Sequence, residues 1–552
     1  MDVVTVERLD HLGIIAGVIK DMGLIEMIDA RLGLDDQEDI PTGEAIAGMI
    51  LNGLGFSDRP MSLTPQFFAN KPVVLLFRDG VSAEHVNRCK LGRSLDKTFS
   101  DGCDTLFSEV ALAVCQQEGI AQTFTCLDTT RFALTGAYVP ETDTQAMAIT
   151  YGYSKDHRPD LKQAVLELMV AQDGGVPLMS QSWDGNASDT VVFKERCEAL
   201  LMQFAASETP RYLIADAKLY TEANAPNLAR LPFITRIPET LTVTQQVIEQ
   251  ACAWGEWQPL NETVKYQRVE LCHYGMAQRW LVVSSQDAWQ RAAQPLAKAQ
   301  AKESEQVQKQ LFHLQAQRFP SETDARAALE TIAQRWCYQQ IAQVALTPHR
   351  QYARKGRPTK QTLQRALQWQ IHASVLPDPA KLTRQQQRKA CFVLGTPIPA
   401  TALTDAAVGA GYKGQSAVER GFRFLKDPVF FVSSLFVKKP SRLQGLLMVM
   451  TLALLVYSVA QRRMRHQLAR QHDTLPNQIG QPGFRPTLRW VFQLLEGINR
   501  VTLAVQGHGT IVMEGLSALR RKILQLCGQT VCSNSRRGLK CLNFNALFFE
   551  LS

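Results

Sequence analysis

The 552-residue sequence predicts an α/β protein: a mixed five-stranded sheet with flanking helices, interrupted by a mixed insertion domain and preceded by an all-helical N-terminal region. Three observations predict this fold class. Hydrophobic residues recur at helical spacing up to about residue 120, short apolar segments follow up to residue 238, and helical spacing returns after residue 400. A chain of this length should form two to four domains.

Residues 1–120 are expected to form short amphipathic helices. In the segment 41–56, PTGEAIAGMILNGLGF, Thr42 is a candidate cap and the apolar residues that follow recur at helical spacing. We therefore assign residues 1–120 to a helical N-terminal region.

Five short apolar or alternating segments follow, each bounded by turn residues, as in strands. The turn Asp173-Gly174-Gly175 has hairpin length, so the second and third strands should be antiparallel neighbours. Helical segments at 190–204 and 221–231 precede the fourth and fifth strands. This order predicts a mixed sheet with helices on its faces, and ribonuclease H-like domains use the same order. The five segments are 124–132, 163–172, 176–183, 211–219 and 232–238.

Residues 239–399 show a different pattern and are expected to form an insertion domain. They contain a hairpin signal, then long helices expected from Asp287 to Gln343, then the basic stretch HRQYARKGRPTKQ. The sheet domain would accordingly consist of residues 121–238 and 400–465. Residues 466–552 are assigned to a basic C-terminal helical region.

The apolar run from Leu446 to Ala460 is too short to cross a bilayer, because a membrane-spanning helix needs roughly 20 apolar residues. A buried helix is the expected structure, and no membrane association is predicted. The 12 cysteines are scattered, and the start MDVVTVERLD lacks a positively charged signal region, which favours a reducing cytoplasm.

Charge is distributed unevenly along the chain. Residues 1–120 hold 10 basic and 19 acidic side chains, residues 349–390 hold 10 and 1, and residues 461–552 hold 13 and 4. One-sided basic stretches in the second half favour a polyanionic partner over a solvated face of mixed sign.

Two of the predicted strands lead into an aspartate: Asp128 closes the apolar stretch FTCLD and Asp216 closes YLIAD. A carboxylate at the end of a core strand is held on rigid backbone at the rim of a sheet, where it can bind a cation. Because Asp is also common in turns that end strands, a structural role is the favoured interpretation for each residue alone.

A third acid, Glu419, lies in a predicted helix that ends before Pro428. Helical spacing places Tyr412, Gln415, Arg423 and Lys426 on the same face as Glu419, beside an apolar face that can pack on a sheet. Such a polar stripe is often only a solvated helix face.

The string Tyr412-Lys-Gly-Gln415-Ser-Ala-Val-Glu419, continued to Lys426, resembles the Y-x2-R-x3-E-x6-K signature of DDE transposases of bacterial insertion sequences, in the IS-four superfamily. All spacings match, and one residue departs: Gln415 stands where the signature has arginine, although Arg423 lies one turn beyond Glu419. The resemblance extends from about residue 124 to residue 465.

The resemblance implies that Asp128, Asp216 and Glu419 are the three catalytic acids and hold two Mg²⁺ or Mn²⁺ ions. It implies cut-and-paste transposition, in which DNA strands are cleaved and joined to a target. Tyr412, Gln415, Arg423 and Lys426 would contact double-stranded DNA at the transposon ends, and two ends imply a homodimer. The protein would act in the bacterial cytoplasm, on the nucleoid. The basic stretch, with Arg354, Lys355 and Arg357, is a candidate DNA clamp or a solvated linker.

Two other functions remain open. A catalytically inactive DNA-binding protein derived from a transposase would keep the fold, and a nuclease would cut without joining. End recognition would belong to the N-terminal region by analogy, yet that region is net acidic. Either a local surface of Arg88, Lys90, Arg93 and Lys97 suffices, or the C-terminal basic part shares the binding.

Overall fold

The structure, a computed structural model, describes residues 3–57, 60–141, 145–154, 157–205, 211–352, 364–427, 437–505 and 508–528. The chain divides into two compact units. Unit 1 comprises Met1–Ile234 and Ala410–Ser552, and unit 2 comprises Thr235–Gly409. Unit 2 therefore includes the whole of the predicted insertion, residues 239–399.

The N-terminal part of unit 1 is a group of helices, as expected, but the prediction of an all-helical region is wrong at its start. Val3–Arg8 forms a strand, β1, which pairs antiparallel with β15 (Asn499–Val505). The partner strand lies almost the whole chain away, so local helical spacing gives no sign of it. The helices are α1 (Leu12–Asp21), α2 (Leu24–Leu32), α3 (Thr42–Leu54), α4 (Thr64–Phe68), α5 (Val73–Leu76), α6 (Arg88–Asp101) and α7 (Cys103–Gln117).

All five predicted strands are present, in the hydrogen-bonded order β4-β3-β2-β5-β6. Among the described residues they belong to a sheet of nine strands, which corrects the prediction of a five-stranded sheet. β2 pairs antiparallel with β3 and parallel with β5, and the turn at Asp173 joins β3 to the antiparallel β4. The helix predicted at 190–204 is α8, whereas the second predicted helix shortens to α9 (Ala225–Leu228). The bounds are β2 (Phe124–Leu134), β3 (Lys162–Ala171), β4 (Pro177–Trp183), β5 (Tyr212–Ala215), β6 (Phe233–Arg236) and α8 (Asp189–Ala205).

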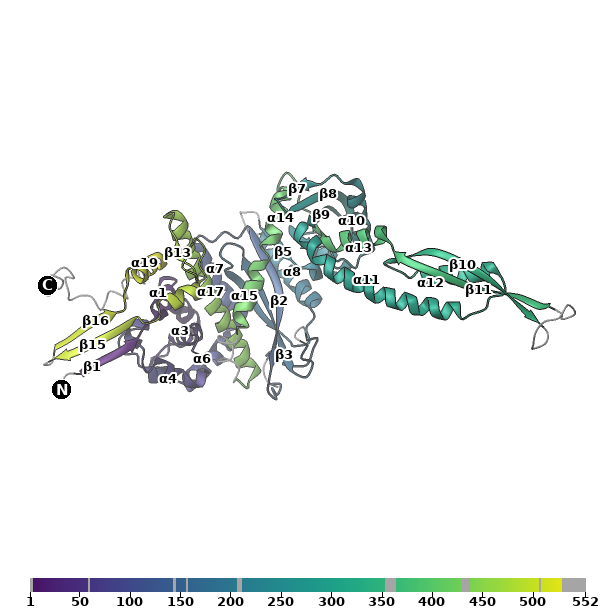
Figure 1. Ribbon diagram of the computed structural model, residues 1–552. Helices are drawn as coiled ribbons and strands as arrows, with labels where there is room; N and C mark the ends of the chain where they lie inside the picture. Colours follow the sequence, from purple (N-terminus) through teal and green to yellow (C-terminus); the bar gives the residue numbers. More distant parts are fainter. Residues whose placement is uncertain are drawn as a thin grey trace. The chain divides into compact units, whose positions relative to one another are not determined.

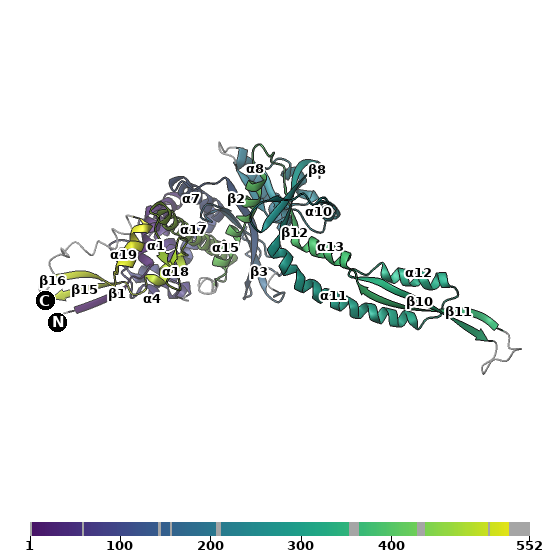
Figure 2. The ribbon, with the colours of Figure 1, turned by 45° about the horizontal axis from the view of Figure 1, so that its top comes forward.

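The apolar run at 446–460 lies in α17 (Pro440–Arg470), the central helix of unit 1. In Figures 1 and 2, α17 lies between the N-terminal helices and α15 (Ser416–Leu425). It is long and apolar enough to cross a membrane, but 89% of its apolar window is buried inside the protein. It packs on α1, α3, α6, α7, α15 and β4, and its Thr451 hydroxyl lies 3.1 Å from the Ser180 hydroxyl of β4. The run therefore forms a core helix, as predicted.

The C-terminal part of unit 1 corrects the prediction of a helical region at 466–552. Beside helices it contains short strands, and β15 and β16 form with β1 a three-stranded antiparallel sheet. Val501, Thr502 and Leu503 are β-branched or apolar, which suits a strand. The elements are β13 (Leu475–Pro476), β14 (Pro482–Gly483), α18 (Leu488–Leu494), β15, β16 (His508–Glu514) and α19 (Ala518–Cys527).

Unit 2 contains the predicted hairpin as β8 and β9, but its long helices end earlier than expected. Helix was predicted up to Gln343, whereas β10 begins at Gln339 and pairs with β11. The strand is stabilised by partners 12 to 38 residues further along the chain, from Tyr352–Gln364 to Gln339–Pro377. Ile371 of β11 packs with Leu311 and Leu329 in a shared core. The elements are α10 (Thr242–Trp254), β7 (Gln258–Pro259), β8 (Val264–His273), β9 (Met276–Ser285), α11 (Gln286–Gln315), α12 (Glu322–Ala333), β10 (Gln339–Tyr352), β11 (Gln364–Pro377), α13 (Pro379–Ala390), β12 (Cys391–Thr396) and the start of α14 (Asp405–Lys413).

An ion pair joins α17 to the turn between β3 and β4. The Arg462 guanidinium donates from Nε to Asp173 Oδ1 at 2.9 Å and from Nη2 to Oδ2 at 2.7 Å, and it also donates to the carbonyls of Glu118 and Gly119. Burial alone would raise the pKa of Asp173, but the bonds from Arg462 and from the Ala121 amide outweigh it, so the pKa lies below its ordinary value. This two-bonded geometry fixes the turn against the core helix.

Replacing Asp173 with asparagine is expected to lower the free energy of unfolding at neutral pH by about 1–3 kcal/mol, because the buried Arg462 loses its carboxylate partner. A depressed pKa contributes stability that is present above the unfolded-state pKa of about 3.9 and is lost as pH falls through the folded-state pKa. Urea unfolding at a series of acidic pH values should therefore show a steeper loss for the wild type than for the variant. Parallel curves would contradict this assignment.

Candidate active site

Asp128 and Asp216 lie next to each other on parallel strands. Leu127 of β2 is paired with Ala215 of β5, and each aspartate directly follows its member of that pair. Neighbouring strands are about 4.8 Å apart, so the two carboxylates, here called the acid pair, start from adjacent backbone positions. The structure thus brings together two acids that are 88 residues apart in the sequence (216 − 128).

The prediction that both aspartates end a strand is correct for Asp216 and wrong for Asp128. β2 continues to Leu134 because its antiparallel pairing with β3 extends that far. β5, in contrast, ends at Ala215, so β2 has no paired β5 residue beyond Leu127. Asp128 is therefore at the point where the neighbouring strand stops, and it is partly exposed there.

Backbone amides orient both carboxylates. Asp128 Oδ1 accepts a hydrogen bond from the Thr129 amide at 2.7 Å. Asp216 is the N-cap of a short 3₁₀ turn, Ala217–Leu219, and its Oδ1 accepts from the Lys218 amide at 2.9 Å. Each bond uses one carboxylate oxygen and restricts the side chain, as in a helix cap.

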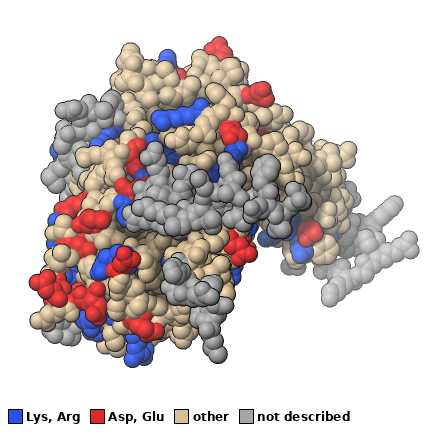
Figure 3. Space-filling view, turned by 90° about the vertical axis from the view of Figure 1, so that its left-hand side faces the viewer, with Lys and Arg blue, Asp and Glu red and all other residues tan. Residues whose placement is uncertain are grey.

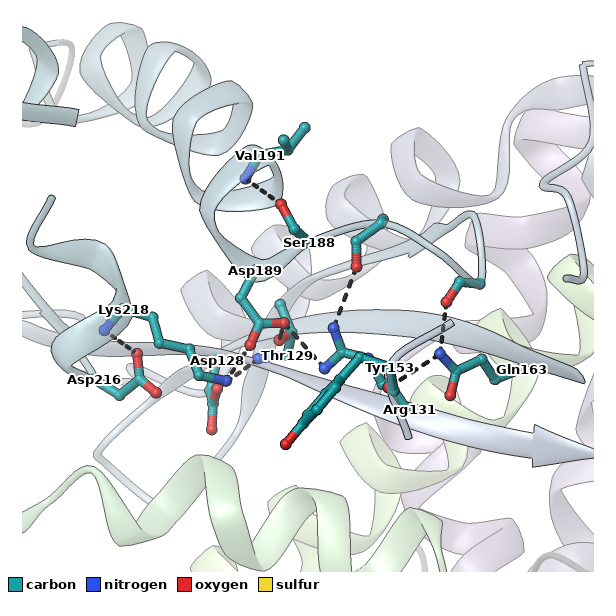
Figure 4. A network of polar contacts seen from close by, with 12 residues as sticks. Asp128, Thr129, Arg131, Tyr153, Gln163, Ser188, Asp189, Val191, Asp216 and Lys218 are labelled. Atoms are coloured by element: carbon teal, nitrogen blue, oxygen red, sulfur yellow. Dashed lines mark hydrogen bonds and ion pairs between the residues drawn. The ribbon is translucent and has the colours of Figure 1, made fainter. Parts of the chain in front are cut away.

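A further carboxylate, Asp189, forms polar contacts with residues around the acid pair (Figure 4). It is buried at the start of α8, accepts from the Thr129 hydroxyl at 2.7 Å and lies 3.2 Å from the Arg131 guanidinium. The Lys218 ammonium also pairs with Asp189. These residues link β2, α8 and the turn after β5. The sequence did not indicate Thr129, Arg131, Asp189 or Lys218. For Lys218 a local signal existed, because it lies two residues after Asp216, within the turn that Asp216 caps.

The helix predicted through residues 412–426 is interrupted, which corrects the expectation of one continuous polar face. Tyr412 lies in α14, Gln415 is buried in the turn and α15 begins at Ser416. A β-carbon at Gly414 would lie 2.2 Å from the Gln172 side chain, whose amide donates to the Gly411 carbonyl at 2.6 Å. This close contact with the end of β3 holds the turn where helical spacing predicted a straight helix.

Glu419, Arg423 and Lys426 share α15. Glu419 and Arg423 are exposed, and the Lys426 ammonium lies 5.8 Å from the ring centroid of Phe132 in β2. α15 packs on β2 and β3. Gly421 allows the helix to lie close to β3, because a β-carbon at this position would lie 3.2 Å from the Leu168 side chain. The helix therefore lies against the strand that carries Asp128.

The two acids and Glu419 were also predicted to hold metal ions. Carboxylate oxygens are ligands that Mg²⁺ and Mn²⁺ prefer, so the donor chemistry fits. Among the described residues, however, no three His, Cys, Asp or Glu side chains are grouped closely enough to hold an ion. The structure thus assembles the acid pair and leaves Glu419 outside a three-ligand group.

Two further sets of predicted DNA contacts have different outcomes. Arg354, Lys355 and Arg357 follow β10 in the sequence and lie outside the described residues. Of the N-terminal basic set, Lys90 is buried and pairs with Glu38, and Lys97 donates to the Gly33 carbonyl.

Arg88 and Arg93 are exposed and line a cavity of about 620 Å³ with Lys438, Lys439 and Arg442. On the face shown in Figure 3, acidic and basic side chains are interspersed where residues are described. Of the four basic residues predicted to form a DNA-binding surface, Lys90 is buried in an ion pair and Lys97 is bonded to a backbone carbonyl, so Arg88 and Arg93 contribute most of the exposed basic surface.

Replacing Asp189 with alanine is expected to lower the free energy of unfolding by about 3–5 kcal/mol, because it leaves the buried Arg131 guanidinium without its carboxylate. Both side chains are only 7% exposed. Chemical unfolding followed by circular dichroism measures this loss. The control is Asp160→Ala, which removes an exposed partner of Arg158 and should leave the unfolding midpoint nearly unchanged; equal effects of the two changes would refute a structural role of Asp189.

Residues 4–112 match a family model described as a domain of unknown function, DUF4277. No curated protein matches the sequence. A solved structure, a piggyBac transposase synaptic complex with hairpin DNA, is similar over 98% of this chain and 85% of that chain, at 9% sequence identity and a TM-score of 0.36. A TM-score of that size carries no argument about fold or function.

Proposed function

We propose that this protein is a DDE transposase of the IS-four superfamily type, with a ribonuclease H-like catalytic domain that cleaves DNA strands and joins them to a target. The observation that carries the proposal is the acid pair: Asp128 and Asp216 occupy adjacent positions on parallel strands, where β5 ends. The strand order β4-β3-β2-β5-β6, with a helix between β4 and β5, supports the ribonuclease H-like assignment.

Asp128, Asp216 and Glu419 would hold two Mg²⁺ or Mn²⁺ ions in this proposal. When bound, such ions make an attacking water or 3′-hydroxyl more nucleophilic and stabilise the leaving oxygen. The Thr129 and Lys218 amides would keep the two aspartates oriented, since each donates to one carboxylate oxygen. Glu419 would approach from α15, which packs on β2.

DNA would lie along the exposed side of α15. Arg423 and Lys426 would contact phosphates, while Tyr412 and the buried Gln415 belong to the preceding helix and turn. Phosphate contacts position a strand without reading its sequence. Arg354, Lys355 and Arg357 remain proposed as a clamp, and two transposon ends would require a homodimer acting in the bacterial cytoplasm on the nucleoid.

One observation favours a second candidate, a catalytically inactive DNA-binding protein derived from a transposase. Within the described residues, the acid pair has no third metal-binding side chain grouped with it. An inactive descendant would keep the fold and the basic helix face but would not cleave DNA.

Single replacement of Asp128, Asp216 or Glu419 with alanine is expected to abolish Mg²⁺-dependent cleavage of DNA that carries the sequences flanking the gene, a loss of at least about 10³-fold, because metal-held groups supply most of the rate. DNA binding in EDTA should change little. The measurement is release of a labelled strand on a denaturing gel.

The matched control is Glu195→Ala, which removes an exposed carboxylate from α8 of the same unit. It should cleave at the wild-type rate. Cleavage retained by any of the three acid variants would remove that residue from the site. A wild-type protein that binds the DNA but never cleaves it, with Mg²⁺ or Mn²⁺, would favour the inactive alternative.

A further inference from the structure

A cavity of about 290 Å³ lies between α15, α17 and the segment that leads into α18, all within unit 1. Four arginines line it: Arg420 and Arg423 of α15, Arg465 of α17, and Arg489 of α18. We call it the arginine cavity. Among the described lining residues, Asp427 is the one carboxylate, so these five side chains carry a net charge of +3 (four arginines minus one aspartate).

Among the described residues, Arg489 is the one arginine of the cavity with a carboxylate partner. It forms an ion pair with Asp427, and its guanidinium also lies 5.3 Å from the ring centroid of Phe56. Arg420 donates to the Ser416 hydroxyl at 2.8 Å, and Arg465 donates to the Pro486 carbonyl at 3.0 Å. Among the described residues, neither of these two guanidinium groups has a carboxylate partner.

Arg465 shows the electrostatic cost of this arrangement. Burial lowers its pKa, and the positive charges of Arg485 and Arg420 lower it further, against the opposite effect of Tyr457. A half-buried cation surrounded by other cations is unfavourable unless an anion compensates it. A bound anion in the cavity would therefore be electrostatically favourable.

The walls of the cavity are held in place by hydrogen bonds between α17 and α18. The Leu488 amide donates to Gln461 Oε1 at 3.0 Å, and the Arg489 amide donates to the Tyr457 hydroxyl at 3.1 Å. The turn at Gly174 and Gly175 closes another side. The arginines therefore come from α15, α17 and the first turn of α18, and the last is hydrogen-bonded to α17. The positions of the cationic groups are thus preorganised.

We propose that the arginine cavity binds a phosphate group of a DNA strand, separate from the acid pair. A guanidinium group can donate two parallel hydrogen bonds to two oxygens of one phosphate. A halide ion cannot accept this pair of bonds, so the arginines favour phosphate over a halide. The volume suits one phosphate with part of its sugar and is small for a whole drug-sized ligand. Arg420 directly follows Glu419 on α15, so a strand held here continues past the proposed catalytic helix. The inference rests on the proposed function.

The test measures binding of a fluorescent DNA duplex by anisotropy in EDTA, over a range of salt concentrations. The double variant Arg420→Gln with Arg465→Gln is expected to bind at least about 10-fold more weakly, and the dependence of log K on log salt should become shallower by about 1, because one phosphate contact is lost. The matched control is Arg470→Gln, an exposed arginine at the end of α17, which should change affinity less than about 2-fold.

The single variants Arg465→Lys and Arg420→Gln test whether a loss of DNA affinity results from misfolding. Lysine keeps the charge of the half-buried side chain but lacks the two-bonded fork, so an intermediate loss is expected. Arg420 is exposed, so its replacement should leave thermal unfolding unchanged. Unchanged DNA affinity and salt dependence in the folded double variant overturn the proposal.

Two further arms separate the sources of phosphate and the two proposals. If inorganic phosphate raises the thermal midpoint of the wild type but not of the Arg465 variant, while DNA affinity is equal in both, the occupant is a free anion and the DNA proposal fails. Asp128→Ala should retain wild-type DNA binding. A protein that never cleaves DNA but loses affinity through the cavity variants would refute the transposase proposal and leave the cavity assignment standing.

Discussion

Burial of α17 is the interaction on which unit 1 depends. Its apolar residues contact the N-terminal helices as well as β4 and α15, so one helix joins these parts of unit 1. Each square ångström of apolar surface that it removes from water contributes about 25 cal/mol to stability. Its polar end is bound as tightly: Arg462 pairs with Asp173, and Arg463 pairs with Asp21 and Glu118.

The position of the candidate site follows from unequal strand lengths beside that core. β2 has ten paired residues along β3 but only four along β5, so the sheet has a step at Asp128. The step exposes two carboxylates on rigid backbone without burying either charge. α15 packs on β2, which carries Asp128, and on α17, with which it lines the arginine cavity.

Most of the sheet could be predicted from the sequence, because strands such as 163–172 and 176–183 are apolar runs bounded by strong turn residues. The errors share a physical cause. β1 and β10 are strands stabilised by partners far along the chain, and the break at Gly414 results from contact with Gln172, so local periodicity carries no record of them. In the candidate site, the sequence indicated Asp128 and Asp216 as candidates, but it gave no sign of the ion pairs that Asp189 forms beside them.

The sequence by itself determined which side chains are available: strand-forming segments, two aspartates beside apolar runs, a glutamate with basic residues at helical spacing, and a buried apolar helix. Only the tertiary structure decided which of these lie together. Parallel pairing made Asp128 and Asp216 neighbours, the turn at Gly414 separated Tyr412 from Glu419, and the packing of α15 on α17 gathered Arg420 and Arg465. Strand register and helix packing depend on contacts between distant residues, which periodicity along the chain does not encode.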